Sequence, residues 1–258
     1  MYIDTSSILQ TFASSLIATA LQYGWTPDSN AADFKGYGKV ADCSLSGFVP
    51  SFPSNQTQLT IPSILEPQFI GLAFGVQNYT CSSSNNFTNV GAVAELIDVS
   101  CYVNAPWFDT IQDTLFPAWD ELSQSMSIQQ AIEFVHFLNP PANLAQHYFV
   151  PNPATGQGVS PKWDFTSNGK FQGNTDAFIV AKGNGTLPSP DDPKKDVAWL
   201  EVLNVEGKVA AEVFRIDTVG GQPPSSCAYG KDSDISVNYV SKYSKSRLLA
   251  AEGIPKLT

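Results

Sequence analysis

The sequence is poor in charged residues, in histidine and in long apolar runs. Only 15% of its 258 residues are Asp, Glu, Lys or Arg, and the two histidines are His136 and His147. No apolar run approaches the roughly 20 residues that a membrane-spanning helix needs. The four cysteines include no Cys-x-x-Cys pair, so spacing indicates no zinc site, and we expect neither a metal nor a cofactor. Because 43% of the residues are hydrophobic, the chain can still form a sizeable core.

Basic residues are scarce in the first part of the chain. Residues 1–150 contain 12 Asp and Glu but only Lys35 and Lys39, whereas residues 151–258 contain 12 residues of each sign. The formal net charge is −10. A surface of this charge repels phosphate backbones and anionic lipid, so nucleic acids and membrane surfaces are poor candidate partners.

A nucleotide-binding motif in its usual context is also lacking. The segment Gly36-Tyr-Gly38-Lys-Val-Ala41 has the glycine spacing of a dinucleotide-binding loop. That loop needs an apolar strand before it and a helix after it, and neither pattern is present. The sequence contains no P-loop and no G-x-S-x-G motif. Glycosidase chemistry by two carboxylates stays open, since any two acids can meet in a fold.

Four N-glycosylation sequons favour a secreted protein, or one within the secretory pathway or a vesicle. Their asparagines, which we expect to carry glycans, are Asn55, Asn78, Asn86 and Asn184. The even number of cysteines fits two disulfides. Cys81 and Cys101 flank a turn-rich stretch, so we predict Cys81–Cys101 and, from the remaining two, Cys43–Cys227. Four free thiols in a cytosolic protein are the alternative.

The N-terminal region predicts a helix followed by a loop. Apolar residues recur at helical spacing between Ile8 and Leu21. Ala18-Thr-Ala20 is similar to a signal-peptide cleavage site, but Asp4 is the only charge nearby and a basic region is missing. We favour a retained helix over a signal peptide. With the Gly-, Pro- and Ser-rich residues 24–67, it forms an N-terminal extension over residues 1–67.

The rest of the chain predicts an all-β domain, an antiparallel β-sandwich or barrel with an N-terminal helix and a helical insertion. Apolar residues at helical intervals indicate two or three short helices, interrupted by Pro117, in an insertion over residues 105–140. We treat residues 1–258 as one domain, with a β core over 68–243 and a C-terminal tail over 244–258. The expected strands are 68–81, 91–101, 144–150, 161–165, 177–182, 197–205, 209–218 and 235–243.

Strand alternation singles out a few polar side chains that face inward. If Asn78 carries a glycan it faces solvent, so Gln77 and Tyr79 face the interior. Burying them requires hydrogen bonds, so they form either a polar core network or part of a pocket lining. His147 lies on an apolar strand face, where a hydrogen-bonded core histidine is the alternative to a catalytic one. Arg215 shares a face with Val213 and Asp217, and an Arg–Asp pair at a sheet edge is the alternative to a pocket role.

Several short blocks together resemble one protein family over roughly residues 68–243. They are similar to the signature blocks of the secreted fungal and bacterial family DUF3455, often mislabelled malate dehydrogenase. Two features differ from the family pattern: the long insertion after Cys101, and Tyr239-Val-Ser-Lys-Tyr-Ser in place of an aromatic run. The blocks include Val76-Gln-Asn-Tyr-Thr-Cys81, Val90–Leu96, Gln146-His-Tyr-Phe149, Val197-Ala-Trp-Leu200 and Phe214–Pro224 with Cys227.

The resemblance implies a pericyclic activity, because some fungal proteins similar to this family are hetero-Diels–Alderases of tropolone–sesquiterpenoid pathways. They join an ortho-quinone methide, formed from a hydroxymethyl tropolone or phenol, to a humulene-type alkene. Such a reaction needs an apolar cavity that holds two small apolar substrates and donors for the quinone-methide oxygen. The expected catalytic residues are Arg215, His147 and Tyr79. The expected substrate-binding residues are Gln77, Trp107, Phe108, Trp119 and Trp199.

A non-catalytic, secreted small-molecule-binding or wall-associated protein is the second hypothesis. A deep cavity with mixed apolar and polar walls favours the cyclase, and a filled core with an exposed aromatic patch favours the binding protein. Either protein is compatible with a homodimer.

Overall fold

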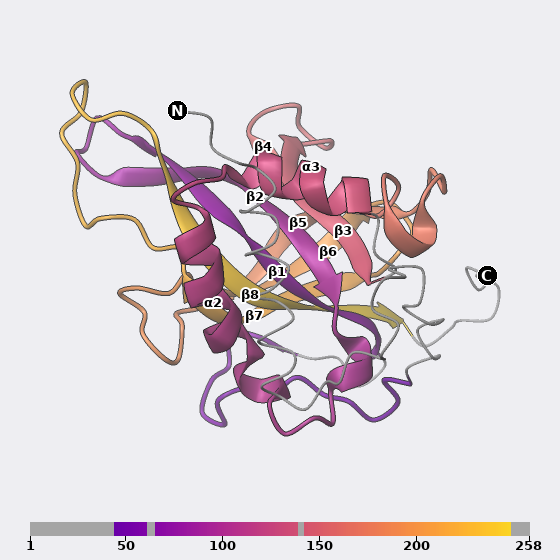
Figure 1. Ribbon diagram of the computed structural model, residues 1–258. Coiled ribbons are helices and arrows are strands. Elements are labelled where there is room, and N and C mark those ends of the chain that lie inside the picture. The colour runs from indigo at the N-terminus through magenta and orange to yellow at the C-terminus, as the bar shows by residue number, and fades with distance from the viewer. Residues whose placement is uncertain (1–43, 61–64, 139–141, 249–258) are drawn as a thin grey trace.

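The computed structural model describes residues 44–60, 65–138 and 142–248. These residues form a closed barrel of eight antiparallel strands in sequence order, in which β8 pairs with β1 (Figure 1). The predicted all-β class is confirmed, and of the two architectures it is the barrel. The predicted N-terminal helix lies outside the described residues. The strands are β1 (Leu65–Cys81), β2 (Phe87–Asp98), β3 (Asn143–Pro151), β4 (Val159–Asp164), β5 (Phe178–Leu187), β6 (Trp199–Glu206), β7 (Glu212–Gly220) and β8 (Ile235–Leu248).

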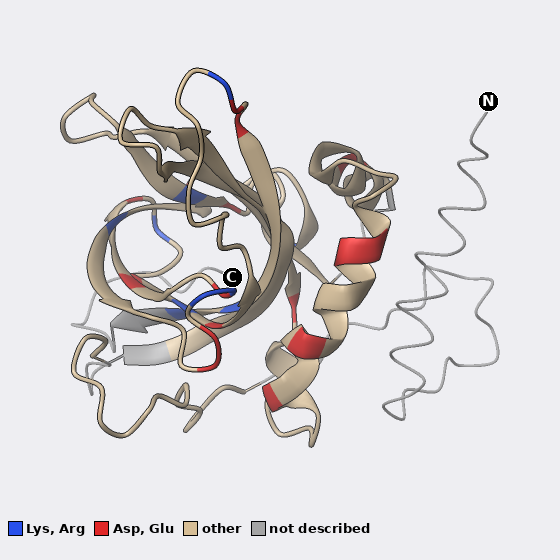
Figure 2. Cartoon of the chain, turned by 90° about the vertical axis from the view of Figure 1, so that its left-hand side faces the viewer, with Lys and Arg blue, Asp and Glu red and all other residues tan. Residues whose placement is uncertain are grey.

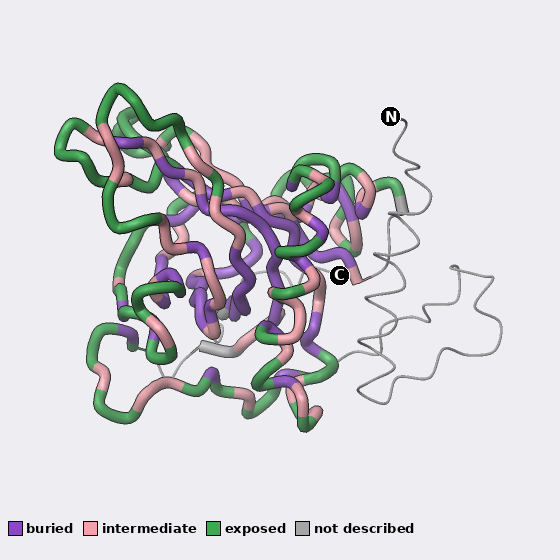
Figure 3. Tube along the Cα trace, turned by 60° about the vertical axis from the view of Figure 1, so that its left-hand side comes forward, coloured by how far each residue is buried: buried purple, intermediate pink, exposed green. Residues whose placement is uncertain are grey.

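Strand alternation separates the barrel interior from its outer layers. Along β1, Leu72 and Phe74 face outward and join the layer under the helices, whereas Ala73 joins the interior cluster. Gly75 lies against β2, where a Cβ would lie 2.2 Å from the carbonyl oxygen of Val93, so only glycine fits. Figure 3 shows that buried residues lie mainly on the strands and exposed residues mainly on the loops. The interior is therefore built mainly from strand side chains, with a few from the connections between strands such as Phe165 and Val209.

The helical insertion lies on the outside of the barrel. After the 3-10 turns η2 (Ser100–Tyr102) and η3 (Phe108–Thr110), helix α2 (Ile111–Leu122) covers β7, β8 and β1, and α3 (Ile128–Leu138) packs on β2 (Figure 1). The expected interruption at Pro117 is wrong, since α2 continues through it. Proline removes one backbone bond, and the burial of Trp119 and Leu122 against the barrel offsets that loss.

The acidic residues are spaced along α2, a helix without Lys or Arg (Figure 2). This arrangement places part of the negative charge that dominates the first 150 residues on the covering layer rather than inside the barrel.

Two expectations about chain ends and cross-links need correction. The predicted Cys81–Cys101 and Cys43–Cys227 bonds are both wrong, because Cys81 pairs with Cys227, 146 residues away, across a Cα–Cα distance of 5.9 Å. Closing the barrel brings the end of β1 beside the β7–β8 connection, a proximity that sequence spacing does not reveal. Cys43 lies outside the described residues, and Cys101 is also disulfide-bonded. Strand β8 continues to Leu248, so residues 244–248 belong to the barrel rather than to a tail.

Candidate functional site

The barrel encloses a cavity of about 210 Å³. Its walls come from β3 to β8 and are mainly apolar and aromatic, with one charged side chain, that of Arg215. The lining residues are His147, Phe149, Pro161, Trp163, Gly183, Gly185, Thr186, Leu200, Val202, Val213, Arg215 and Tyr243.

Strand register places Arg215 at the centre of one cavity wall. Its cross-strand neighbours are Leu200 on β6 and Tyr243 on β8, and all three line the cavity. Its Nε and Nη2 atoms both donate to the carbonyl oxygen of Ala198, at 3.1 and 2.8 Å. Although Arg215 is only 8% exposed, it forms no ion pair within the described residues. A buried cation without a carboxylate partner favours an electron-rich ligand oxygen.

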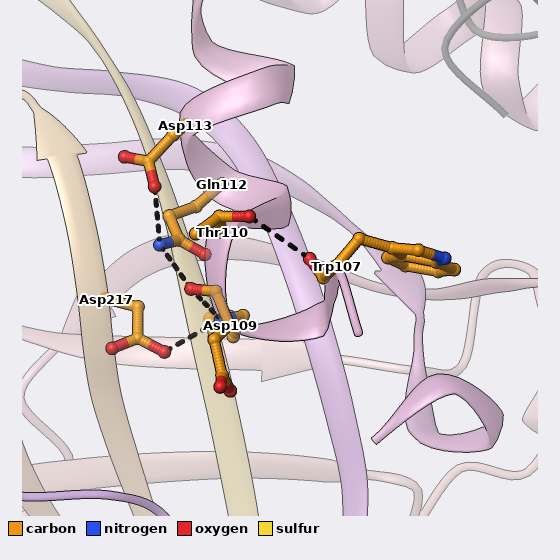
Figure 4. A network of polar contacts seen from close by, with 7 residues as sticks. Trp107, Asp109, Thr110, Gln112, Asp113 and Asp217 are labelled. Atoms are coloured by element: carbon orange, nitrogen blue, oxygen red, sulfur yellow. Dashed lines mark hydrogen bonds and ion pairs between the residues drawn. The ribbon is translucent and has the colours of Figure 1, made fainter. Parts of the chain in front are cut away.

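The expected alternative partner of Arg215, Asp217, turns to the outside of the barrel. The β7–β8 register shifts between Ile216 and Val219, and Asp217 has a φ of 49° in the left-handed region. Its Oδ2 instead accepts from Nζ of Lys242 at 2.9 Å, beside Asp109 at the start of the insertion (Figure 4). The β-bulge therefore leaves Arg215 without the carboxylate that simple alternation would give it.

His147 is a neutral hydrogen-bond acceptor on the opposite wall. Its Nδ1 lies 2.8 Å from the carbonyl oxygen of Lys162, which can only accept, so Nδ1 carries the proton and Nε2 does not. Burial lowers the pKa of His147 to about 3, and the charges of Arg215 and Lys245 act in the same direction. The ring stacks on Trp163, its cross-strand partner, at 4.6 Å between centroids. His147 can accept a hydrogen bond at neutral pH, but it has no second proton to donate.

Two tyrosines form a buried hydrogen-bonded pair at the cavity wall. The hydroxyl oxygens of Tyr239 and Tyr243 are 3.2 Å apart, and both side chains are buried. Burial raises the pKa of Tyr239 well above its ordinary value, so its hydroxyl stays protonated. Of the two, Tyr243 lines the cavity. It can donate to a ligand oxygen while it accepts from Tyr239, and such chains of hydrogen bonds reinforce one another.

Gln77 and Tyr79 face inward as expected but do not line the cavity. The Tyr79 hydroxyl donates to the carbonyl oxygen of Gly221 at 2.7 Å, and the Gln77 Oε1 accepts from Nδ2 of Asn89 at 3.1 Å. Asn78 between them faces outward, where its Oδ1 accepts from the Ser236 hydroxyl at 2.8 Å. Of the two interpretations, the polar core network is therefore the one observed.

The four aromatic residues expected to bind substrate lie outside the barrel. The Trp107 ring lies beside Tyr102 and points away from the polar cluster around Asp109 (Figure 4). Phe108 lies under Nζ of Lys242 in the layer between helices and barrel.

Trp119 anchors α2 by donating from Nε1 to the Gly75 carbonyl oxygen at 2.8 Å. Trp199 packs on Phe52 of the loop that covers the outer face of β6 and β7. The expectation that the helical insertion helps to build the cavity is wrong, because the closed barrel separates its interior from the helices.

Sequence reasoning missed Tyr243, Trp163 and Gly183 as cavity residues. The signal for Tyr243 was available: Tyr239 and Tyr243 are four residues apart in one strand, so alternation puts them on one face. Trp163 could have been inferred in the same way, once the pairing of β3 with β4 was known. No local signal distinguishes Gly183 from a turn glycine.

The four sequon asparagines are all at the surface, three of them exposed and Asn78 half-buried. The side-chain nitrogen of Asn184 donates to Glu201 Oε1, and that of Asn86 donates to the Ser84 carbonyl oxygen. Glycosylation at these positions stays a prediction.

Within the described ranges, no group of three or more His, Cys, Asp or Glu side chains is arranged to hold a metal ion. In the same part of the chain, no helix is both long enough and apolar enough to cross a membrane.

Comparison with known protein families gives one match, over residues 62–244, to the family described as protein of unknown function (DUF3455). The chain belongs to this family. Comparisons with curated proteins and with solved structures give no match. In this DUF3455 protein the matched region begins just before β1 and ends within β8, so it includes every residue that lines the cavity.

Proposed function

We propose that this DUF3455 protein is a cofactor-independent cyclase that carries out a hetero-Diels–Alder reaction inside its barrel. The substrates are an ortho-quinone methide, formed from a hydroxymethyl tropolone or phenol, and a humulene-type alkene. The observation that carries the proposal is the buried Arg215, which forms no ion pair within the described residues, beside Tyr243 in a mainly apolar cavity.

The cavity residues match the charge changes of this reaction. Loss of water breaks the bond between carbon and the hydroxymethyl oxygen, and the ring hydroxyl gives up its proton, so no oxidant or reductant is needed. Arg215 and Tyr243 donate hydrogen bonds to the ring oxygen as its electron density rises. Nε2 of His147 accepts from the hydroxyl group of the substrate. The addition then forms one carbon–carbon and one carbon–oxygen bond, and its main requirement is a near-attack arrangement.

The roles of the expected catalytic residues change accordingly. Tyr243 takes the place of Tyr79, whose hydroxyl is already used by Gly221. His147 acts as an acceptor rather than an acid, because burial holds its pKa near 3. Arg215 keeps the role that the sequence suggested.

The size of the cavity supports a second candidate function, a secreted carrier of one small molecule. Ligand pockets commonly measure about 300–1,000 Å³, and 210 Å³ suits a single aromatic ring. For the cyclase, the second substrate must therefore enter beside the glycines of β5, Gly183 and Gly185. A carrier would bind the oxygenated ring alone and release it unchanged.

A secretory location fits both functions. The Cys81–Cys227 disulfide and the surface positions of the four sequons support it. Mass spectrometry of the protein from its native source tests this by detecting glycans at those asparagines.

The test is product formation from the two substrates by the wild type, Arg215→Gln and Tyr243→Phe. We expect at least tenfold slower turnover for Arg215→Gln, about 1.4 kcal/mol of transition-state stabilisation. A smaller loss is expected for Tyr243→Phe, with product stereochemistry followed in both. Lys208→Gln, which removes an exposed charge, is the matched control and should be fully active.

Thermal melting distinguishes a lost site from a lost fold. A stable and fully active Arg215→Gln contradicts the assignment of the site. A wild type that forms no product but binds the hydroxymethyl phenol saturably contradicts the cyclase and favours the carrier.

A further inference from the structure

Lys245 is a buried lysine in the barrel that the proposed cyclisation does not use. Its side chain is 0% exposed, and its Nζ has no hydrogen-bond partner among the residues that the structure describes. The amine lies 4.0 Å from the centroid of the Phe165 ring, which belongs to an aromatic cluster with Phe69 and Phe171. Lys242, three residues earlier, is equally buried but has an ion-pair partner in Asp217. The two lysines on one strand thus have opposite surroundings.

Lys245 adjoins the cavity. It follows Tyr243 on the inner face of β8, and its cross-strand neighbour on β7 is Val213. Both of those residues line the cavity, and the charge of Lys245 acts on His147 in the opposite wall. Lys245 is therefore flanked by cavity-lining residues, and its amine lies against the aromatic cluster next to them.

Burying an ammonium group without an ion-pair partner costs free energy, so these surroundings favour the neutral amine. Burial lowers the pKa of Lys245 well below its ordinary value, and this effect outweighs the charge of Asp98 and the face of the Phe165 ring, which favour the ammonium. Arg215, the neutral His147, Tyr239 and Tyr243 also face the interior, and none of them is a carboxylate that could pair with an ammonium. A neutral, desolvated lysine amine is a nucleophile for carbonyl carbons.

We propose that Lys245 forms an imine with an apolar aldehyde that enters the barrel cavity. The Nζ lone pair attacks the carbonyl carbon, giving a carbinolamine after proton transfer from nitrogen to oxygen. The hydroxyl group then leaves with a second proton from nitrogen, so that a carbon–nitrogen double bond and one water are formed. No oxidant or reductant takes part, and the proposal does not depend on the cyclisation.

The neutral form of the Lys245 amine favours an aldehyde over an anionic ligand. A carboxylate would need an ammonium as its partner, whereas a carbonyl carbon needs the neutral form. The phenyl rings around Nζ provide apolar contact for a hydrocarbon tail and no hydrogen-bond donor for an acid.

The experiment uses hexanal with cyanoborohydride, which reduces an imine to a stable secondary amine, at pH 6. Exposed lysines are then protonated and unreactive. We expect one hexyl group per chain, on the peptide that contains Lys245, at a level at least tenfold above that on exposed Lys182 or Lys195. Lys245→Met should lose this modification, and the matched variant Lys182→Met should keep it.

The wild-type peptide map decides the proposal even if Lys245→Met fails to fold. Hexyl groups confined to the amino terminus and exposed lysines, with Lys245 unmodified, would overturn it. Equal modification of all lysines, rising together with pH, would also overturn it.

Discussion

Lys242 on β8 and Asp217 on β7 form a largely buried ion pair on the outer face of the barrel, beside the start of the insertion. The Lys242 side chain is 1% exposed, and its Nζ also donates to the carbonyl oxygen of Asp109 at 3.2 Å. Removing one partner leaves the other charge buried without compensation. We expect Lys242→Met to lower the free energy of unfolding by about 3 kcal/mol.

The matched control for Lys242 is Lys208→Met, which breaks the exposed pair with Asp176 and should cost less than about 1 kcal/mol. Both variants are compared by urea denaturation at neutral pH. Equal losses of stability in Lys242→Met and Lys208→Met would contradict a stabilising role for the Lys242–Asp217 ion pair.

The buried carboxyl group of Glu95 should make the free energy of unfolding depend on pH. This residue is 0% exposed, and burial raises its pKa from 4.5 to about 8. Burial also lowers the pKa of its partner His136, 3.0 Å away, so the two form a neutral hydrogen bond rather than an ion pair. The folded state keeps a proton that the unfolded state loses above pH 4.5. The stabilisation is therefore complete below pH 4.5 and is lost as the pH rises to about 8.

Glu95→Gln removes this dependence, because glutamine is neutral at every pH. The variant should match the wild type near pH 4.5 and exceed its stability near pH 8 by an amount on the order of a few kcal/mol. Chemical denaturation at both pH values measures the difference. Glu133→Gln, an exposed carboxylate on the same helix as His136, should keep the wild-type slope. If the free energy of unfolding of Glu95→Gln changed with pH as steeply as that of the wild type, Glu95 would be ionised in the folded state.

At the level of single residues, the sequence could indicate Arg215 and His147 but not their partners. Alternation along one strand is enough to turn both inward. The loss of Asp217 from the inner face depends on a bulge, the outer position of Trp199 depends on which face of β6 turns inward, and that of Trp119 depends on where α2 packs. These are long-range consequences of closure, and no local pattern encodes them.

Among the elements, the loop of residues 44–60 is held on the barrel by a pair of carboxyl groups. Glu201 Oε2 accepts from the backbone nitrogen of Thr60 at 2.9 Å, and Leu59 packs against the outer face of the sheet. Burial, and then hydrogen bonding and repulsion from Glu201, raise the pKa of Glu212 to about 8. Glu212 therefore keeps its proton at neutral pH and shares it with Glu201 in a hydrogen bond.

Raising the pH through 8 should loosen the loop around Thr60, because two buried carboxylates then repel each other. Hydrogen exchange at the Thr60 amide, corrected for intrinsic rates, should lose protection above pH 8 in the wild type. In Glu212→Gln the protection should be independent of pH. Unchanged protection in the wild type up to pH 9 would contradict the shared proton.

Most elements were predictable because their signals are local. All eight strands were expected, since period-two apolar runs and turn residues mark them, and most of their ends were placed within a few residues. The helices of the insertion follow a 3.6-residue period. Their position outside the barrel was not predictable, because an amphipathic helix packs equally well on an outer row such as that of Leu72 and Phe74 or over an open barrel end.

For the whole molecule, closure is the property that positions the site. Pairing of β8 with β1 closes the interior and brings Cys227 beside Cys81, and within that interior the pairing of β7 with β8 places Tyr243 beside Arg215. The sequence allowed either a sandwich or a barrel, because both use the same strands and turns. Only the register of all eight strands shows that the inner faces meet around a cavity, and this is why the predicted disulfide pairing failed while the predicted fold class held.

The central claim is that the barrel cavity is the site of the reaction, and Gly183 offers the most direct test. It continues the inward alternation of Ile179 and Ala181, and a Cβ there would meet no atom within 4 Å. Because Gly183 lies at the exposed edge of the cavity, Gly183→Phe should block the cavity at its mouth without straining the strand. Lys182→Phe adds the same ring to the opposite, exposed face of β5 and is the matched control.

The decisive measurement is the rate of product formation by Gly183→Phe, Lys182→Phe and the wild type, with thermal melting of each. We predict at least a tenfold loss of turnover for Gly183→Phe, with its melting temperature and the activity of Lys182→Phe unchanged. A Gly183→Phe protein that melts like the wild type and turns over substrate at the full rate would contradict the account.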